Sequence, residues 1–407
     1  PRRIIPIDDA NPIARRIAAL NGREDRIRER DHYLYLQPLE KTGGDKVVVG
    51  GRRMLNFASY SYLDLLGHPE IQDAARAALE KYGTGTHGVR LLAGTTPVHV
   101  ELEETIARFK GTESAIAMSS GYAANSSTIA ALTGRGDVVI CDKLNHASII
   151  DGCLLSRASF VRYEHNNMAT LERALREAPR SAAKLVVTDA VFSMDGDIVD
   201  LPEVIRLCRR YDALLMVDEA HSIGVLGATG RGIEEHYGID NGDIDILMGT
   251  LSKTIPSIGG YIAGDELLIR YLRHASRAFF FSAALPPPSA AAATAALNVI
   301  EAEPERVARL QANVRFMIQG LQQRGFNTLD SASPIIPIIA GDDERACALA
   351  KQSQEHGIFV LPVLTPAVQK GASRLRVTVT AAHTEATMMR AVDVFEGVGQ
   401  ALSLIHI

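Results

Sequence analysis

Short apolar runs alternate with helical patterns between about residue 69 and about residue 265. The strand candidates are continuous apolar runs, most of them bounded by Gly, Asp or Ser, at 115–118, 138–141, 185–188, 214–217, 244–248 and 260–263. Continuous runs of this kind are typical of strands that are covered on both faces. The pattern therefore predicts an α/β domain built on a mainly parallel sheet.

The predicted helices carry start and stop signals. Pro69 and Pro97 stand in the first turns of two helices, and Gly83 and Gly111 follow their last residues. Proline lacks the N–H that a helix start leaves unpaired, and glycine tolerates the backbone conformation that ends a helix. The alanine-rich stretch 290–300 follows three prolines, and we expect it to be a buried helix, because a membrane span needs about 20 apolar residues.

A second, smaller α/β pattern follows the long helical stretch 304–325. It contains two strands and two further helices, at 335–339, 375–379, 344–356 and 384–398. We interpret this part as a separate small domain. The predicted organisation is an N-terminal segment packed on the small domain or on a partner, a large domain and a small C-terminal domain, over 1–50, 51–300 and 301–407.

Composition and charge narrow the classes of function. Of 407 residues 46% are hydrophobic and 22% are charged, and 43 basic against 48 acidic side chains give a net charge of −5. A negative chain offers no general attraction to polyanions, so nucleic acid is not an expected partner. The four cysteines lack metal-ligand spacing, so we expect no metal and reduced, buried thiols. The N-terminus has charges where a signal peptide needs an apolar region, so a cytoplasmic location without membrane insertion is expected.

The strongest chemical signal is Thr250-Leu251-Ser252-Lys253, which follows the predicted strand 244–248 and precedes Gly259-Gly260. Open α/β folds bind ligands at the carboxyl ends of their strands, where this lysine would lie. A desolvated lysine can form a Schiff base with an aldehyde cofactor. Most Ser-x-Lys tripeptides are solvated loop or helix positions, so this motif indicates a cofactor lysine only together with other motifs at the same edge of the sheet.

Thirty-five residues upstream, Val217-Asp218-Glu219-Ala220-His221 follows another predicted strand. Neighbouring parallel strands would bring Asp218 and Lys253 to the same edge of the sheet. A carboxylate there can pair with a pyridinium nitrogen and strengthen the ring as an electron sink. On its own, Asp218 could equally be a helix N-cap and His221 a surface histidine.

Two further segments follow predicted strands. Ser119-Ser120-Gly121-Tyr122-Ala123-Ala124-Asn125 opens a helix, and the free N–H groups of a helix N-terminus suit a phosphate. Residues 145–152 follow the next strand, and an imidazole at His146 could lie flat on a cofactor ring. Taken separately, the first segment is an ordinary helix cap and His146 is a capping or core histidine.

Together these segments resemble the α-oxoamine synthases, a group of fold-type I pyridoxal-phosphate (PLP) enzymes, and the resemblance runs from about Leu55 to Val398. Further matching motifs are Gly83-Thr84-Gly85-Thr86-His87-Gly88-Val89-Arg90, His99-Val100-Glu101-Leu102-Glu103, Val191-Phe192-Ser193-Met194-Asp195-Gly196-Asp197, Phe281-Ser282-Ala283-Ala284-Leu285-Pro286-Pro287 and Leu375-Arg376-Val377. The resemblance implies a large domain with a mainly parallel central sheet and a smaller C-terminal α/β domain.

The resemblance also implies roles for the residues at the strand ends. Lys253 would bind the cofactor aldehyde and later move the α-proton of the substrate. Asp218 would pair with the pyridine nitrogen, and His146 would stack on the ring. Ser193 and His221 would contact the phenolic oxygen.

The resemblance further implies a phosphate site, a substrate site and a homodimer with a shared active site. The residues implied around the cofactor phosphate are Ser120, Gly121, Tyr122, Thr250, Ser252 and, from the other subunit, Ser282. Arg376 would hold the carboxylate of the amino acid by a two-pronged pair, which a lysine cannot reproduce. As an alternative, Arg376 could belong to a structural ion pair.

Two positions depart from the family pattern. Ser61 stands where relatives often have Asn, and Val89 replaces the Ser of a common Gly-Ser-Arg triplet. Both positions lie in the region that senses the substrate, with Ser61 expected to face it. The segment 145–152 looks most like the 2-amino-3-ketobutyrate CoA ligases, whereas 87–90 also resembles synthases of polyketide or lipid pathways.

The predicted reaction is a decarboxylative condensation of glycine, alanine or serine with an acyl thioester on coenzyme A or a carrier protein. Its products are an α-amino ketone, carbon dioxide and a free thiol. An aminotransferase or aldolase on the same fold would share Lys253 and Asp218. A regulatory subunit without cofactor is the non-enzyme alternative, and the presence of Lys253 argues against it.

Overall fold

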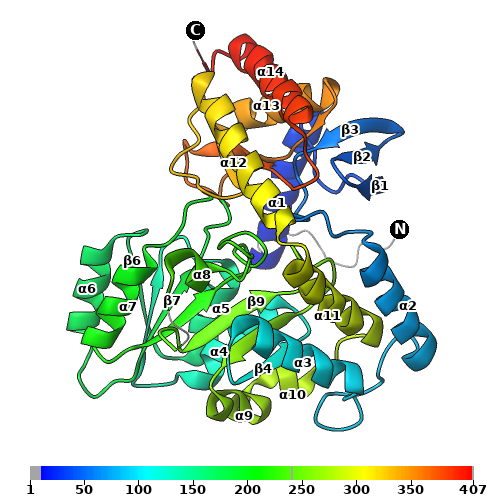
Figure 1. The fold of residues 1–407 in the computed structure, drawn as a ribbon. Helices are drawn as coiled ribbons and strands as arrows, with labels where there is room; N and C mark the ends of the chain where they lie inside the picture. Colours follow the sequence, from blue (N-terminus) through cyan, green and yellow to red (C-terminus); the bar gives the residue numbers. More distant parts are fainter. Residues whose placement is uncertain (1–10, 240–241, 406–407) are drawn as a thin grey trace.

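The computed structural model describes residues 11–239 and 242–405. It shows a large body built around a seven-stranded sheet and a smaller body above it in Figure 1, with α11 (Pro287–Ala302) leading into α12 (Glu305–Gln323) between them. This is the predicted fold-type I architecture.

The strands of the large sheet lie in the order β4-β10-β9-β8-β7-β5-β6. Their bounds are β4 (Ser114–Met118), β5 (Val138–Asp142), β6 (Ser159–Tyr163), β7 (Lys184–Asp189), β8 (Leu214–Asp218), β9 (Ile246–Thr250) and β10 (Gly260–Gly264). Strands β6, β5, β7, β8 and β9 are parallel, and β10 runs antiparallel to both of its neighbours. Strand β6 was not predicted, because this edge strand has several exposed positions and no continuous apolar run.

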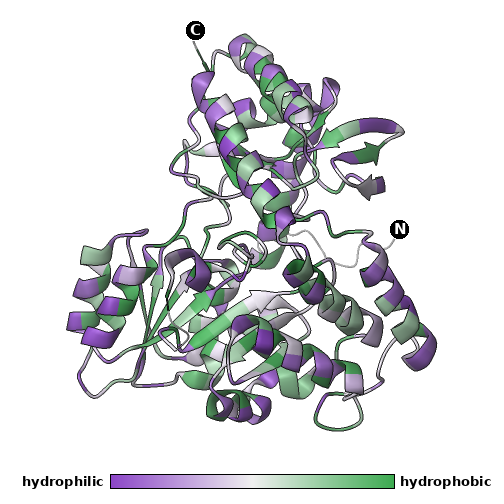
Figure 2. Cartoon of the chain, in the orientation of Figure 1, coloured by the Kyte–Doolittle hydropathy of each residue, from purple (hydrophilic) through white to green (hydrophobic). Residues whose placement is uncertain are grey.

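Side chains alternate between the two faces of this sheet. On β5, Val138 and Ile140 enter one hydrophobic cluster, whereas Val139 and Cys141 enter another on the opposite face. Figure 2 shows hydrophobic colour along the central strands and hydrophilic colour on the outer helices. Burial on both faces is the reason why these strands read as continuous apolar runs.

Helices cover both faces of the sheet (Figure 1). In chain order they are α2 (Pro69–Tyr82), α3 (Pro97–Lys110), α4 (Gly121–Leu132), α5 (Ala147–Ser156), α6 (Met168–Glu177), α7 (Leu201–Arg210), α8 (Ile233–Tyr237), α9 (Glu266–Ala275) and α10 (Arg277–Phe281), before α11. The prolines predicted to open α2 and α3 occupy first-turn positions, and Gly111 ends α3 in the left-handed conformation.

The smaller body has its own hydrophobic cluster and an antiparallel sheet in the order β11-β14-β13. Its elements are β11 (Ile335–Gly341), α13 (Asp343–Glu355), β12 (Ile358–Phe359), β13 (Pro362–Val363), β14 (Ser373–Thr378) and α14 (Glu385–Ala401). Strand β12 pairs in parallel with β3 (Arg52–Asn56), which extends the sheet of β1 (Leu39–Gly43) and β2 (Lys46–Val49). Leu55 and Phe57 are therefore buried in the cluster of the smaller body.

The N-terminal segment lies against the smaller body. In α1 (Pro12–Glu29), Arg23 pairs with Asp343 at 3.2 Å, and farther along the chain Tyr35 donates a hydrogen bond to the carbonyl of Pro362. The first ten residues of the predicted segment 1–50 lie outside the described residues. Among the described residues no helix is long and apolar enough to cross a membrane, and the four cysteines are free and buried.

Candidate active site

The predicted site residues gather at the carboxyl ends of the large sheet. Asp218 ends β8, Thr250 ends β9, and Asp218 lies beside Met248 in the register of the two parallel strands. Gly121 and His146 follow β4 and β5 at the same edge. The topology therefore brings together segments that are more than a hundred residues apart in the chain.

Lys253 lies in a buried polar cluster. Its Nζ is 2.8 Å from Nε2 of His221, and Nδ1 of His221 is 2.7 Å from the hydroxyl of Tyr62. Burial lowers the pKa of Lys253 to about 8; the Asp218 carboxylate opposes this shift, and the Arg376 guanidinium adds to it. Burial and the adjacent Lys253 hold the pKa of His221 well below its usual range. Near neutral pH, the pair thus combines a neutral imidazole with a lysine that loses its proton easily.

The Asp218 carboxylate is 4% exposed and is held from two sides. Its Oδ2 accepts a 2.6 Å hydrogen bond from Nδ2 of Asn125, and its Oδ1 accepts a 2.8 Å bond from the N–H of Ala220. The second bond is a local turn contact, and no described helix begins directly after Asp218, so the helix-cap alternative is not observed. The first bond, to a helix from another part of the chain, shows that the carboxylate is also positioned by tertiary structure.

A cradle for an anion forms at the start of α4. Ser120 is the N-cap, and its hydroxyl accepts the N–H of Ala123 at 3.0 Å. Within residues 11–239 and 242–405, the N–H groups of Gly121 and Tyr122 have no acceptor. Unpaired N–H groups at a helix N-terminus fit a phosphate.

Close backbone packing shapes this cradle. A Cβ at Gly260 would lie 2.5 Å from the Cα of Gly121, so only glycine lets β10 approach the start of α4. A Cβ at Gly121 would lie 3.1 Å from Oγ1 of Thr250. That Thr250 hydroxyl is 2.9 Å from the hydroxyl of Ser252, so both predicted hydroxyls lie close to the cradle.

Arg376 has one unpaired nitrogen. Its Nε donates to the carbonyl of Ser193 at 2.7 Å, and its Nη1 donates to the hydroxyl of Thr378 at 3.2 Å. Nη2 is buried and has no hydrogen-bond partner in the described chain. Since no carboxylate of the described chain pairs with this guanidinium, the structural ion-pair alternative is not observed. The unpaired nitrogen fits a carboxylate from a ligand.

The other predicted residues are placed less centrally. The hydroxyl of Ser61 is buried without a partner in the described part of the chain, next to Tyr60, whose ring lies 4.9 Å from the Arg376 guanidinium. Ser282 ends α10, beside the bridge between Val89 and Ala283. Among the described residues, no hydrogen bond joins Ser282 to the cradle.

Five residues at the site were not predicted: Tyr60, Tyr62, Asn125, Ser148 and Asp189. Asn125 and Ser148 stood inside the motifs without a role, and nothing in their spacing separates them from helix-surface positions. Asp189 offered a signal, because it ends β7 as Asp218 ends β8, and the two are register partners.

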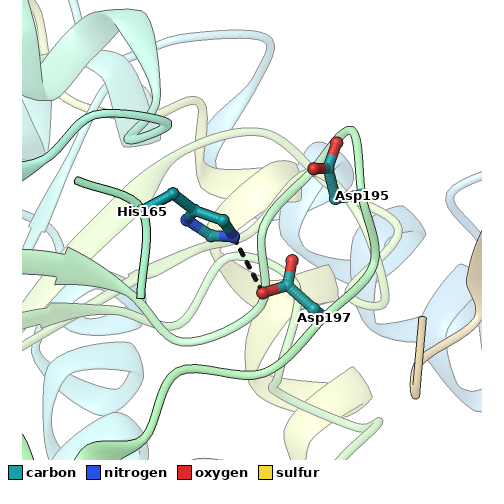
Figure 3. A group of neighbouring side chains, drawn as sticks. All are labelled: His165, Asp195 and Asp197. Carbon is teal, nitrogen blue, oxygen red and sulfur yellow. Dashed lines mark hydrogen bonds and ion pairs between the residues drawn. The ribbon is translucent and has the colours of Figure 1, made fainter. Parts of the chain in front are cut away.

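A second polar cluster lies beside this edge (Figure 3). It contains His165, Asp195 and Asp197, whose donor atoms lie close enough to hold an ion. His165 already bonds Asp197 at 2.9 Å and Asp142 at 3.0 Å, and Asp195 pairs with Arg374 at 2.5 Å. We therefore interpret the cluster as an ion-pair network that holds the loop carrying Ser193.

Known proteins resemble this chain along almost its whole length. The family model for aminotransferase class I and II matches residues 52–395. The 8-amino-7-oxononanoate synthase of Geobacter sulfurreducens is 45% identical over 95% of this chain and 99% of its own length. The 8-amino-7-oxononanoate synthase 1 of Bacillus subtilis is 41% identical over 93% and 96%.

The solved structures lead to the same group. Serine palmitoyltransferase of S. paucimobilis, with a bound PLP–myriocin aldimine, superimposes with a TM-score of 0.94 at 33% identity over 97% of this chain and all of that one. The 8-amino-7-oxononanoate synthase of Francisella tularensis has a TM-score of 0.75 at 27% identity, over 86% and 98%.

The chain therefore belongs to the aminotransferase class I and II family. Within that family it is an α-oxoamine synthase, a PLP-dependent acyltransferase that condenses an amino acid with an acyl thioester and releases carbon dioxide. The anion cradle, the desolvated Lys253 and the buried Asp218 fit PLP.

Proposed function

We propose that the enzyme makes 8-amino-7-oxononanoate from alanine and a seven-carbon acyl thioester with a terminal carboxylate. The observation that carries this proposal is the name shared by relatives 40–46% identical over 89–96% of this chain. In that product the new bond joins the ketone carbon to the carbon that bears the amine. The carbon that bears the amine and the methyl group attached to it come from alanine, and the other seven carbons come from the acyl group.

We propose that the chain holds PLP through contacts to five of its parts. Lys253 would bind the aldehyde carbon, and Asp218 would face the pyridine nitrogen. His146 would lie on the ring, and Ser193 and His221 would contact the phenolic oxygen. The phosphate would lie in the cradle of Ser120, Gly121, Tyr122, Thr250 and Ser252.

The residues around the substrate have separate tasks. When bound, PLP draws electrons from the α-carbon of the amino acid and so makes its proton acidic. Lys253 removes that proton and later returns one, which suits a pKa of about 8 because the free amine is then available near neutral pH. His221, held neutral beside it, accepts a hydrogen bond from Lys253 and orients the amine.

Arg376 orients the amino acid. Its Nη2 is the free hydrogen-bond donor for the substrate carboxylate, while bonds to Ser193 and Thr378 fix the plane of its guanidinium. A fixed carboxylate presents the α-proton to Lys253. After the acyl group has joined the α-carbon, the same carboxylate leaves as carbon dioxide.

We further propose a cytoplasmic homodimer with a shared site. Leu92, Leu154, Leu155 and Phe281 are 65–85% exposed, which suits burial against a second copy. Phe281 precedes Ser282, the residue proposed to reach the partner's phosphate. The free cysteines are consistent with a reducing compartment. Mixing inactive Lys253→Ala and Ser282→Ala chains should restore activity through hybrid dimers with one intact site; no recovery would refute the shared site.

A serine palmitoyltransferase-like reaction is the second candidate, favoured by the 0.94 TM-score of that structure. The test offers alanine, serine or glycine with acyl-CoA thioesters of several lengths, with and without a terminal carboxylate, and follows thiol release. The proposal predicts highest kcat/KM for alanine with the seven-carbon ω-carboxy thioester. A preference for serine with a long unsubstituted chain would support the second candidate instead.

A further inference from the structure

We propose that Asn125 and Ser148 are positioning residues that link the Asp218 carboxylate to the His146 ring and hold that ring in a single tautomer. The inference rests on the proposed function, in which Asp218 and His146 contact the cofactor. Neither Asn125 nor Ser148 is placed to touch the reacting atoms. Their effect would reach the cofactor through the two residues that they orient.

The link is a continuous chain of hydrogen bonds. Nδ2 of Asn125 lies 2.6 Å from Oδ2 of Asp218 and 2.9 Å from Oγ of Ser148. Oγ of Ser148 lies 2.8 Å from Nδ1 of His146. The chain thereby connects the end of β8, the middle of α4 and the first turn of α5.

The direction of each proton follows from the groups involved. The Asn125 amide nitrogen has two hydrogens and no acceptor capacity, so it donates to both Asp218 and Ser148. The Ser148 hydroxyl therefore accepts one bond and has its own hydrogen left to donate to Nδ1 of His146. The backbone N–H of Ser148 also points to that nitrogen, at 3.3 Å. With two donors facing it, Nδ1 has no proton, and neutral His146 has its hydrogen on Nε2.

The orientation of the Asn125 amide is determined by its surroundings. Asn125 is 1% exposed and Ser148 is fully buried, so water does not complete the network. A flipped amide would place Oδ1 of Asn125 against the Asp218 carboxylate, which is repulsive. In the observed orientation that Oδ1 has no partner among the described residues, a cost that the two donated bonds offset. Partial desolvation also lowers the pKa of His146, which agrees with a neutral ring.

The arrangement leaves each cofactor-facing group little freedom. Both oxygens of Asp218 are engaged, by Asn125 and by the N–H of Ala220, so the carboxylate cannot rotate. The backbone N–H of His146 donates to Asp189 at 2.9 Å, which fixes the main chain that carries the ring. A rigid carboxylate and a rigid ring lower the ordering cost of cofactor binding.

The test uses the full chain without cofactor and labels its histidines with ¹⁵N. Long-range ¹H–¹⁵N spectra report which ring nitrogen is protonated, and the His146 signals are assigned by their loss in His146→Gln. We expect Nδ1 of His146 to be unprotonated in the wild type. In Asn125→Ala and in Ser148→Ala its shift should move toward a tautomer mixture, whereas Ser148→Thr, which keeps the hydroxyl, should restore it.

Thr128→Val is the matched control, because Thr128 is a fully buried polar residue of α4 whose hydroxyl has no partner in the described chain. It should leave the His146 shifts unchanged. Dissociation constants for PLP, measured by fluorescence quenching, should rise about tenfold in Asn125→Ala relative to Thr128→Val.

A protonated Nδ1 in the wild type, or unchanged shifts in Ser148→Ala, would overturn the proposal. If Asn125→Ala does not fold, Ser148→Ala and its Thr rescue still decide it. Failure of the proposed function would be seen separately, as absence of thiol release with every substrate pair, and would leave the tautomer of the cofactor-free protein as it is.

Discussion

Two lysines of the large body, the buried Lys110 and the half-buried Lys253, lie in different electrostatic surroundings. The Lys110 side chain, at the end of α3, is 1% exposed and pairs with Glu219 at 2.7 Å and with Glu234 at 3.3 Å. Its Nζ also donates to the carbonyl of Arg231. Lys253 is bonded to a neutral histidine, and no carboxylate of the described chain forms an ion pair with it.

The comparison shows that burial alone does not make a lysine reactive. Removing an ammonium from water is expensive, and a nearby carboxylate repays most of that cost. Lys110 has such partners, so its role is structural. Lys253 forms no such ion pair. Burial outweighs the opposing effect of the Asp218 carboxylate, and Arg376 adds to burial, so the pKa of Lys253 falls to about 8 and part of the amine is free for chemistry.

The first prediction removes the reactive lysine. Lys253→Ala should lower thiol release about a thousandfold, because it deletes both the covalent attachment point and the base. Borohydride reduction of the wild type followed by mass spectrometry should find the cofactor on Lys253. A cofactor adduct on Lys110 or on any other lysine would show that Lys253 is not the reactive lysine.

The second prediction removes the structural lysine. Lys110→Met should lower the free energy of unfolding by about 3–5 kcal/mol, because it leaves the Glu219 and Glu234 carboxylates buried without their cation. Urea denaturation measures this loss. Lys81→Met, at an exposed position in the last turn of α2, is the control and should change stability by less than about 0.5 kcal/mol. Equal effects would mean that the ion pairs contribute nothing.

The third prediction separates charge from shape at Arg376. Arg376→Lys keeps the positive charge but loses the planar fork, so amino-acid affinity should fall about tenfold or more while PLP affinity stays unchanged. Arg376→Gln should in addition raise the pKa of Lys253, because the Arg376 charge helps to lower it.

The pKa of Lys253 is read from the pH dependence of the rate at which the cofactor-free enzyme captures PLP, a rate that rises as Lys253 loses its proton near pH 8. An unmoved profile in Arg376→Gln would show that burial alone sets the pKa. Unaltered amino-acid affinity in Arg376→Lys would assign Arg376 to structure.

The fourth prediction extends the contrast to histidines. Burial disfavours the charge of His165, but hydrogen bonds to Asp142 and Asp197 outweigh burial and raise the pKa to about 10, whereas the pKa of His221 is lowered. Because the pKa of His165 is higher in the folded state, protonation of His165 stabilises the fold. This contribution is complete below the unfolded-state pKa of about 6.5 and is lost as pH rises through about 10.

The test of the fourth prediction is His165→Gln. It should cost about 1–3 kcal/mol below pH 6.5, with the difference from the wild type shrinking toward pH 10. Denaturant midpoints across this range measure it. A pH-independent difference would mean that the imidazolium charge plays no part.

Much of the fold was predictable because the large sheet is covered on both faces. Its core strands appear as apolar runs, and the residues that follow them, such as Asp218 and Lys253, share one edge wherever those strands are parallel. The edge strand β6 and the union of β3 with β12 were not predictable. Their positions depend on partners far away in the chain and leave weak local patterns.

The sequence by itself determined the alternation of strands and helices, the family resemblance and the identity of the central Lys253, because local periodicity and motif order are properties of the chain alone. Only the tertiary structure decided which side chains meet. It placed Tyr62 behind His221, left one nitrogen of Arg376 unpaired, and joined Asn125 to Asp218. Hydrogen bonding and burial depend on distances between residues remote in sequence, and these distances also set the contrast between Lys253 and Lys110.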